Sequence, residues 1–358
     1  MTSYPGTEKE QRIPEKILRP LVSEIFERCG MSADNAALLA DTLVVADLRG
    51  CHSHGALLIP EYVRKLTAGG VNPKGKPRVA RDSQAALLVD GDNSLGQIAA
   101  TFAMRRAIER ARDTGVAATA VGGSNHCGAM AYFAMLALPE DMIGIATTHA
   151  LPTMAPWGGI DCILGINPMA VAIPAGEESP IVLDAAFAAA ARGKVKVYHQ
   201  KGIPLPEGWA FDSEGRPTTD TKKALEGLLQ PIGQYKGYGF ALVMGILSAV
   251  LSGALFGTEL GDVVNGPKPG RDGHFFIALK VAAFEDVARF KQRTDGIIRQ
   301  MRSSRRAEGV ERIYSPGEVE FESEKLYREE GIPLNRKTLQ GISEAAKTVG
   351  VDPSPLQG

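Results

Sequence analysis

Histidines are the residues of this chain whose type and surroundings best fit acid–base chemistry, and six of them occur. His126 follows an apolar, strand-like run and lies among small residues in GGSNHCGA, where a substrate can approach closely. An unperturbed imidazole titrates near neutral pH, which suits a group that takes and returns a proton. We therefore interpret His126 as a candidate general acid/base, with a loop histidine bonded only to the backbone as the alternative.

A second group of polar residues lies in the glycine-flanked stretch DLRGCHSHG. Ser53 and His54 place a hydroxyl and an imidazole side by side before a new helix, an arrangement that can pass a proton or hold an anion. Ser53 is equally a good helix cap. Asp184 ends the strand-like run PIVLD and is either functional or a cap, and His274 reads as structural.

Neither the histidines nor the cysteines are spaced as metal ligands. The closest histidine pair is His52-x-His54, and no H-E-x-x-H motif is present. The four cysteines contain no C-x-x-C pair and read as reduced thiols of a cytosolic protein. We expect no metal site.

Composition and charge narrow the class of protein. The chain has 358 residues, is 44% hydrophobic and 23% charged, and carries 40 basic against 41 acidic side chains, which excludes a disordered chain. Without a basic surplus, a nucleic-acid partner is not expected. The N-terminal residues 1–16 contain no apolar core of a signal peptide, so we expect a cytoplasmic enzyme.

Hydrophobic periodicity places these residues on an alternation of helices and strands. Strand–helix–strand order in the middle of the chain predicts an α/β layer architecture. Expected helices are 14–29, 32–50, one from His54 to 69, 97–113, 283–304 and 336–349. Expected strands are 85–91, 115–123, 142–149, 169–174, 180–186 and 274–281. The pattern predicts an N-terminal helical part (1–75), a central α/β domain (76–300) and a C-terminal helical part (301–358).

One stretch, 237–258, has no charged residue and is long enough to cross a bilayer. It is rich in small residues, lacks an aromatic belt and has no flanking Lys/Arg asymmetry. We therefore interpret it as a fully buried core helix and expect no membrane partner. It begins GYGFAL, which lacks the third glycine of G-x-G-x-x-G, so a standard dinucleotide fingerprint is absent.

Several motifs together resemble the type-2 malate/L-lactate dehydrogenases. They are RGCHSHG (49–55), GGSNHCGAMAYF (122–133), APWGG (155–159), GINPMAVAIP (165–174), ARGKV (191–195), WAFDSEGRPTTD (209–220) and KGYGFAL (236–242). The family also contains ureidoglycolate and sulfolactate dehydrogenases and Δ1-piperideine-2-carboxylate reductases, and the resemblance covers about residues 15–345. It implies a non-Rossmann α/β fold that binds NAD(P), with helical N- and C-terminal parts packed together, in a homodimer.

The resemblance also implies roles for individual residues. His126 matches the proton acceptor of the hydroxy-acid members, and Ser53, His54 and Asp184 match a relay proposed for the imine reductases. The positions that match nicotinamide-nucleotide contacts are Met130, Ala150, Asp184, Ala185, Ala186 and Lys236.

One departure bears on the substrate. Where the family pattern has an arginine that faces the substrate carboxylate, this chain has Leu58. Loss of a bidentate cation is not a neutral change, and it makes Arg49 the candidate carboxylate partner. Tyr62 retains the tyrosine of the same pattern and is expected to contact the substrate.

These observations predict hydride transfer between NAD or NADP, with NAD preferred, and C2 of a small-molecule 2-hydroxy/2-oxo acid. One alternative is NADPH-dependent reduction of a cyclic imino acid by the Ser53–His54–Asp184 set. A further alternative is a homologue that binds the cofactor without turnover.

Overall fold

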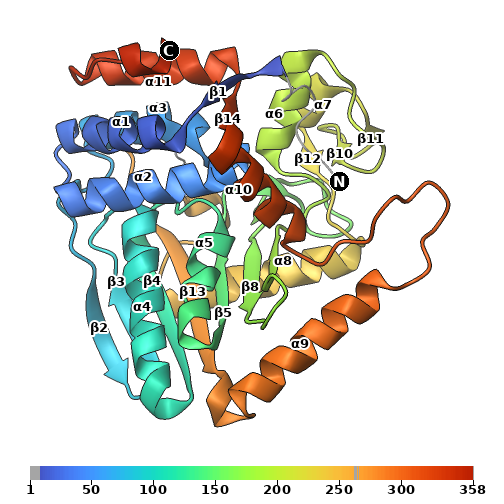
Figure 1. Cartoon of the computed structure of the whole chain (residues 1–358). Helices are drawn as coiled ribbons and strands as arrows, with labels where there is room; N and C mark the ends of the chain where they lie inside the picture. The colour runs from blue at the N-terminus through green and yellow to red at the C-terminus, as the bar shows by residue number, and fades with distance from the viewer. Residues whose placement is uncertain (1–8, 262–263, 265, 358) are drawn as a thin grey trace.

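The computed structural model describes residues 9–261, 264 and 266–357, and a seven-stranded sheet forms its centre (Figure 1). In spatial order, its strands are β2 (Arg78–Ser83), β3 (Ala86–Asp90), β4 (Val116–Ser124), β13 (Asp272–Lys280), β5 (Met142–Thr148), β8 (Met169–Ile173) and β9 (Ile181–Ala185). The edge strand β2, exposed along its whole length, has no counterpart among the expected strands.

The sheet is mixed, and this confirms the α/β class. β3 and β4 are parallel and are joined by α4 (Gly96–Thr114), as the strand–helix–strand pattern predicts. All other neighbours in the sheet are antiparallel. Because β13 runs against β4 and β5, the start of β13 lies at the same edge as the ends of those two strands, so His126, His149 and His274 are brought to one edge.

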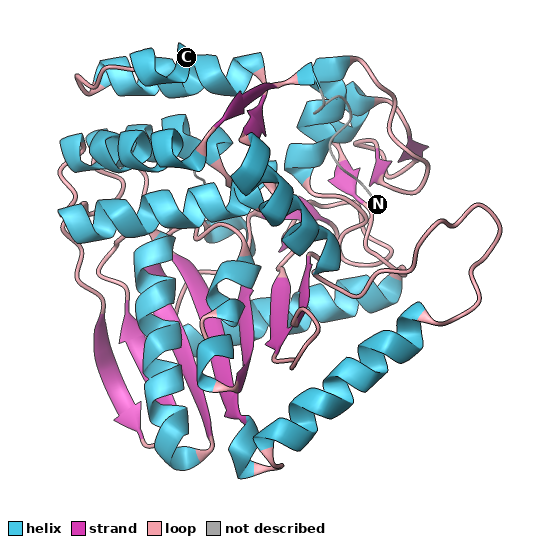
Figure 2. Cartoon of the chain, in the orientation of Figure 1, coloured by secondary structure: helices cyan, strands magenta, loops and turns pink. Residues whose placement is uncertain are grey.

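Helices cover both faces of the sheet (Figures 1 and 2). α4 and α5 (Met130–Met135) pack on one face, and α8 (Tyr235–Ser248) contacts β4, β5 and β13 on the other. The buried stripe of α4 consists largely of alanines, which lets the helix axis lie close to the strands. These alanines are Ala99, Ala100, Ala103, Ala107 and Ala111.

The two ends of the chain form one helical layer above the sheet. α1 (Glu15–Arg28), α2 (Ala33–Leu48), α3 (Ile59–Thr67) and α11 (Arg336–Thr348) share one hydrophobic core. β1 (Gln11–Ile13) pairs with β14 (Ile332–Leu334). The expectation that the terminal parts pack together is thus confirmed. The boundaries 1–75, 76–300 and 301–358 stay a prediction, and residues 1–8 and 358 lie outside the described residues.

A smaller lobe with its own core lies within the expected central domain. Its elements are β6 (Pro152–Met154), β7 (Leu164–Gly165), α6 (Arg192–Lys201), β10 (Ala210–Phe211), β11 (Pro217–Thr218), α7 (Thr221–Glu226) and β12 (Leu228–Leu229). α8 contributes to the same core. The range 76–300 therefore holds two hydrophobic clusters.

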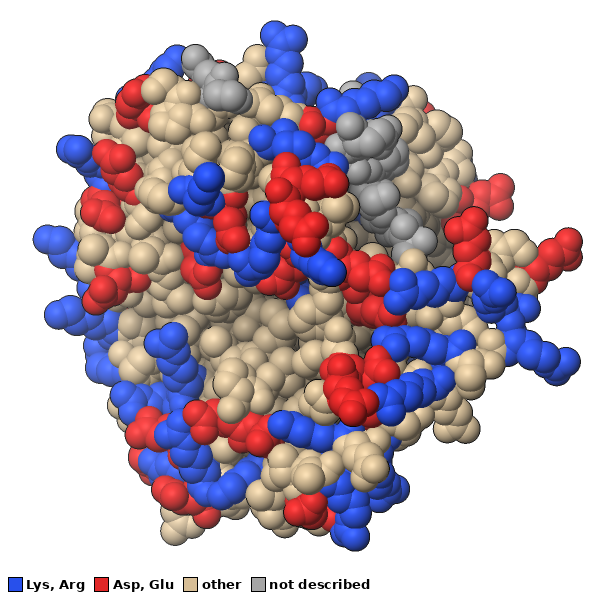
Figure 3. All heavy atoms as spheres, in the orientation of Figure 1, with Lys and Arg blue, Asp and Glu red and all other residues tan. Residues whose placement is uncertain are grey.

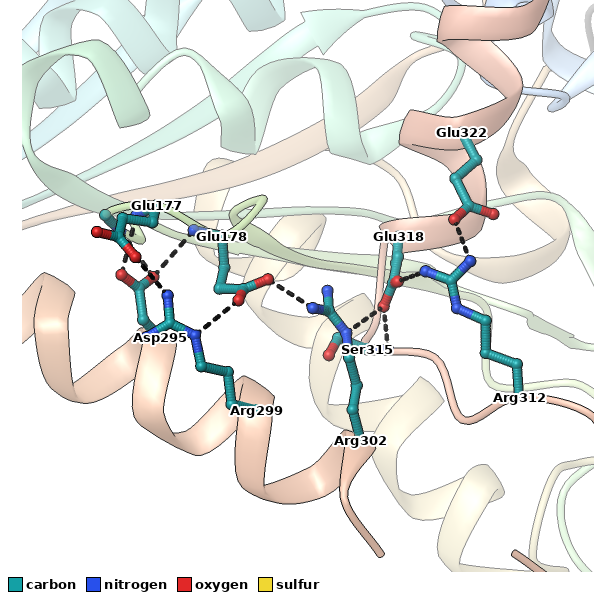
Figure 4. A network of polar contacts seen from close by, with 10 residues as sticks. Glu177, Glu178, Asp295, Arg299, Arg302, Arg312, Ser315, Glu318 and Glu322 are labelled. Atoms are coloured by element: carbon teal, nitrogen blue, oxygen red, sulfur yellow. Dashed lines mark hydrogen bonds and ion pairs between the residues drawn. The ribbon is translucent and has the colours of Figure 1, made fainter.

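Charged residues fix α10 (Glu318–Glu330), a helix that the sequence interpretation did not include (Figure 4). Arg302, at the end of α9 (Val287–Arg302), pairs with Glu178 and also with Glu318 at 3.2 Å. Glu318, which is nearly buried, pairs with Arg312 as well. Asp295 accepts backbone N–H groups from 176–178. This network holds the first turn of α10 against the β8–β9 end of the sheet.

The expectation of a fully buried core helix at 237–258 is wrong. α8 ends at Ser248, and only a third of the apolar segment Tyr235–Ser252 is buried, although that segment has the length and composition of a membrane span. Phe240, Val243 and Ile246 are about half exposed. Their spacing of three places them on one side of the helix, so α8 has one apolar side in the core and another at the surface.

Candidate active site

A buried carboxylate shapes the turn that carries Ser53 and His54. Asp47, near the end of α2, bonds Nδ1 of His52 at 2.7 Å and the backbone N–H of Ala56 at 2.7 Å. A Cβ at Gly55 would lie 2.2 Å from the Asp47 carboxyl carbon, so only glycine fits there. Asp47 therefore organises the turn, with His52 as one of its partners.

Ser53 and His54 form the first link of the expected relay. The Ser53 hydroxyl lies 2.9 Å from His54 Nδ1. The ring of His54 lies nearly parallel to the ring of His126, with 5.9 Å between centroids. The two candidate acid/base residues, which are 72 positions apart in the sequence, are thus neighbours.

His126 is held from the other side by Tyr62. The Tyr62 hydroxyl lies 2.7 Å from His126 Nδ1 and accepts a hydrogen bond from Gln97 Nε2 at 2.8 Å. Tyr62 and Gln97 are fully buried, whereas His126 is partly exposed. Within the described residues, His126 Nε2 has no hydrogen-bond partner, so it is the ring nitrogen that the protein leaves unoccupied.

A cleft of about 660 Å³ opens beside these residues, a size suited to a small organic ligand. Its walls come from the end of α2, the 51–54 turn, the start of α5, the end of β9 and α10. The candidate residues that line it are Arg49, Ser53, His54, Met130, Asp184 and Ala186. His126 lies behind His54 and does not itself line this cleft.

Asp184 lines the cleft without completing the expected relay. Its carboxylate accepts the backbone N–H of Ala131 at 2.7 Å, and no hydrogen bond to Ser53 or His54 is present. Desolvation raises the pKa of Asp184 to about 6, and the N–H donors of Ala131 and Met130 oppose that rise. The carboxyl group therefore titrates close to neutral pH while facing a cleft, as functional carboxyl groups often do.

The structure does not bring all of the cofactor candidates to the cleft. Ala150, Ala185 and Lys236 do not line the cleft. Asn167 lies in the sequence between Ile166 and Pro168, which both line the cleft. Its Oδ1 accepts a hydrogen bond from the backbone N–H of Ala150 at 2.8 Å, and its Nδ2 donates one to the backbone oxygen of Ala241 on α8 at 2.7 Å. One buried side chain thus fixes the loop after β5 to α8, the helix whose first turn contains Lys236.

The cations in the cleft fit an anionic ligand. Arg49 is nearly buried and stacks on Phe321, and its Nη1 has no hydrogen bond, although Glu324 lies 3.6 Å away. Leu58 packs against the apolar core of the terminal parts instead of presenting a charge. Lys194, which the sequence interpretation did not single out, also lines the cleft, and burial lowers its pKa.

Burial favours the neutral form of His54 and His126. Desolvation, with a smaller contribution from His54, lowers the pKa of His126 to about 3, and desolvation also lowers the pKa of His54. A neutral imidazole can accept a proton on whichever ring nitrogen carries no hydrogen. Within the described residues, no set of three or more His, Cys, Asp or Glu side chains is arranged to hold a metal ion.

Three further features of the site were not predicted from the sequence. The sequence interpretation placed Tyr62 at the substrate, whereas its hydroxyl faces His126. Gln97 was not singled out, because a glutamine in a helical pattern carries no signal of what it contacts. The α10 residues Glu320, Ser323 and Tyr327 form one wall of the cleft. They lie 190 or more positions after His126 in the sequence, and no local sequence pattern indicates a contact over such a separation.

Comparisons with known proteins place this architecture. The family model described as malate/L-lactate dehydrogenase matches residues 13–343. Malate dehydrogenase of Pyrococcus horikoshii is 39% identical over 350 residues, 95% of this chain and 96% of that protein. A Pseudomonas putida Δ1-pyrroline-2-carboxylate/Δ1-piperideine-2-carboxylate reductase is 32% identical over 96% of this chain and 99% of its own length.

The solved structure of sulfolactate dehydrogenase from Methanocaldococcus jannaschii superposes with a TM-score of 0.90 at 36% identity, over 96% of this chain and 99% of that chain. Sequence and fold agree across nearly the whole length. Enzymes with such names transfer hydride with a nicotinamide cofactor. The chain therefore belongs to the malate/L-lactate dehydrogenase family and is an oxidoreductase that acts on CH–OH or C=N groups.

Proposed function

We propose that this protein transfers a hydride between NAD(P) and C2 of a 2-hydroxy/2-oxo acid, with His126 as the general acid/base. The observation that carries the proposal is the state of the His126 ring: Nδ1 is held by Tyr62, and Nε2 has no partner among the described residues. A fixed ring with one available nitrogen is the geometry that proton transfer to a bound substrate requires.

The nicotinamide, when bound, supplies or takes the hydride, and the protein must orient C2 and manage one proton. In oxidation, neutral His126 takes the hydroxyl proton of the substrate on Nε2. In reduction, the protonated ring returns that proton to the oxygen at C2. The low pKa of His126 favours the neutral form, and an anionic substrate beside the ring opposes that effect by stabilising the imidazolium.

Arg49 is the proposed partner of the substrate carboxylate. Its guanidinium lines the cleft, and Nη1 makes no hydrogen bond and only an ion pair with Glu324 at 3.6 Å, so an anionic substrate would compete with Glu324 for this cation. Leu58 cannot serve, because its side chain is apolar and packs toward the core. Met130, Asp184 and Ala186 on the cleft wall, with Ala150, Ala185 and Lys236 beyond it, are the proposed cofactor contacts, and NAD is the proposed cofactor.

A second candidate function, reduction of a cyclic imino acid with NADPH, is favoured by the hydrogen bond between Ser53 and His54. A hydroxyl paired with an imidazole at the cleft surface can deliver a proton to an imine nitrogen. Asp184, whose pKa is raised to about 6 mainly by desolvation, lines the same cleft and would complete the relay once a ligand or water joins it to Ser53.

The test follows absorbance at 340 nm with NADH and NADPH separately, against 2-oxo acids and cyclic imines. Oxidation of NADH with one 2-oxo acid is the expected result. Turnover with imines alone would replace the proposal by the second function. If NADH binds but neither a 2-oxo acid nor a cyclic imine is turned over, the protein is instead a homologue that binds the cofactor without catalysis.

We further propose a cytoplasmic homodimer, with the exposed apolar side of α8 at the interface. Phe240, Val243 and Ile246 lie on that side, and Phe240 stacks on Phe187 at 5.4 Å, which holds the surface in place. The chain has 40 basic and 41 acidic side chains, and the two kinds are interspersed on the face seen in Figure 3. Neither nucleic acid nor an anionic membrane is a proposed partner, because no excess of basic side chains attracts one.

Light scattering tests this interface. Phe240→Glu should halve the particle mass, because a buried charge is unfavourable at an apolar contact. Phe284→Glu, at a highly exposed residue before α9, is the matched control and should leave the mass unchanged. A wild-type protein with the mass of one chain, or one that sediments with lipid vesicles, would contradict the proposal.

A further inference from the structure

A buried chain of three side chains ends at His126. Gln97 Nε2 donates to the Tyr62 hydroxyl oxygen at 2.8 Å, and that oxygen lies 2.7 Å from His126 Nδ1. Gln97 lies in the first turn of α4 and Tyr62 on α3. Both are shielded from solvent, so no water competes for these bonds.

The close approach of α4 to the His126 loop depends on Gly96. A Cβ at this position would lie 2.0 Å from Asn125 O and 2.7 Å from Cys127 Cβ, so any other residue would push the helix away. Gln97, the next residue, is thereby brought within reach of Tyr62. The packing fixes where the amide lies, and the hydrogen bonds decide its effect on His126.

The phenolic hydroxyl of Tyr62 has one hydrogen to donate in this row of hydrogen bonds. Burial raises its pKa far above the usual value, so the hydroxyl stays protonated. Because the hydroxyl oxygen accepts from Gln97, its own hydrogen is left to point at His126 Nδ1. An Nδ1 that accepts a hydrogen bond is unprotonated, and a neutral imidazole then carries its proton on Nε2.

The second polar atom of the Gln97 amide is also informative. Oε1 is buried and has no hydrogen-bond partner among the described residues. Rotation of the amide about its last side-chain bond would present Oε1 to Tyr62 in place of Nε2. Tyr62 would then donate to Gln97 and accept from a protonated Nδ1, which leaves Nε2 of His126 as a base.

We propose that Gln97 is a positioning residue whose amide sets the tautomer of His126 through Tyr62. With Nε2 of Gln97 on Tyr62, as in this structure, His126 presents an N–H to the oxygen or nitrogen of an oxidised substrate. With Oε1 on Tyr62, His126 presents a lone pair to the hydroxyl of a reduced substrate. Glutamine suits this position because it offers both a donor and an acceptor. The consequence for turnover rests on the proposed role of His126, whereas the tautomer itself does not.

Nitrogen NMR of protein labelled with ¹⁵N-histidine measures the tautomer without any substrate, with the His126 signals assigned by their loss in His126→Gln. The expected wild-type result is a proton on Nε2, and Gln97→Met should populate the Nδ1–H form. The matched control is Thr101→Val, which changes another buried side chain of α4 with an unpartnered oxygen and should leave the signals unchanged. A wild-type proton on Nδ1, or the same tautomer in Gln97→Met, would overturn the proposal.

Kinetics add a second, independent readout. Gln97→Met should lower kcat on the order of 10- to 100-fold, the size expected when a partner that orients a functional histidine is lost, with the affinity for NADH unchanged. Gln97→Glu retains an acceptor but loses the neutral amide's donor, so it should impair reduction of the oxo acid more than Gln97→Met does at pH 8. A changed tautomer with unchanged kcat would keep the positioning role and contradict His126 as the acid/base.

Discussion

Two pairs of histidines lie near the same edge of the sheet and differ in what surrounds their ring nitrogens. His274 is fully buried, with Nδ1 2.7 Å from the Thr148 hydroxyl and Nε2 2.8 Å from the Ser124 hydroxyl. His149 is nearly buried, and its Nδ1 lies within hydrogen-bonding distance of the backbone oxygen of Gly273, at 3.2 Å. In the other pair, Ser53 and Tyr62 hold one nitrogen of His54 and His126 respectively.

The comparison teaches that a low pKa does not by itself identify the catalytic ring. Burial lowers the pKa of His274 to about 3 and of His149 to about 4, and it lowers the pKa of His126 to about 3 as well. What separates the pairs is their surroundings: His54 lines the cleft and stacks on His126, whereas both nitrogens of His274 bond to protein hydroxyls, and Nε2 of His149, which has no partner among the described residues, is buried away from the cleft. We therefore assign one pair to chemistry and the other to the fold.

The largest change in stability should come from the structural pair. His274→Leu leaves the Ser124 and Thr148 hydroxyls without a buried partner, so we expect the free energy of unfolding to fall by about 2–4 kcal/mol. Urea denaturation measures this fall, and kcat per folded molecule should stay near the wild-type value. Loss of turnover in fully folded His274→Leu protein would place this histidine in the catalytic machinery.

The turn that carries His54 offers a second way to disturb only one of the two histidine pairs. Gly55→Ala places a methyl group 2.2 Å from the Asp47 carboxyl carbon, and overpacking of this kind costs about 1–3 kcal/mol. We expect lower stability together with lower turnover, because Ser53 and His54 move with the turn. Gly239→Ala on α8, where a Cβ has open space, is the control for the added methyl group.

A smaller and more selective effect is expected at Ser53. Ser53→Ala removes the hydrogen bond to His54 Nδ1 and leaves the contact between His126 and Tyr62 intact. Loss of one such bond corresponds to about a tenfold change in rate. Steady-state assays should show that loss for imine substrates, with little change for 2-oxo acids. Equal losses for both classes would mean that the two histidines act as one unit.

A separate effect concerns how the stability of the protein depends on pH. The pKa of His126 is about 3 in the folded protein and about 6.5 in the unfolded chain, so between these values the unfolded state binds a proton that the folded state does not. His126 therefore makes the protein less stable as the pH falls through this window. Denaturation of His126→Gln from pH 6.5 to 4 should show a shallower fall than in wild type. Equal slopes would contradict a depressed pKa at this position.

The elements that carry His126 could be predicted from the sequence, because each has a clear local pattern of hydrophobic residues. The helix 97–113 and the strands 115–123 and 142–149 were predicted within one or two residues, because each alternates or repeats in a clear period. The strand ends placed His126 at the sheet edge for the same reason. The resemblance of motifs supplied the family, and the comparisons confirmed it.

The rest depends on contacts between distant segments. The partners of Tyr62 and Gln97 lie on other elements, and no period in the sequence reports them. The 237–258 stretch was expected to be fully buried, since hydrophobicity alone does not distinguish a core side from an exposed apolar side. α10 was missed because its pattern is mainly charged, and ion pairs rather than an apolar stripe hold its first turn.

Turnover of His126→Gln with NADH and the best 2-oxo acid tests the central claim most directly. General acid/base help is typically worth about 10²–10⁴-fold, so we predict a loss of kcat in that range with the affinity for NADH and the thermal stability unchanged. A variant that turns over at the wild-type rate, or one whose loss follows entirely from weaker NADH binding, would contradict the assignment of His126 as the residue that moves the proton.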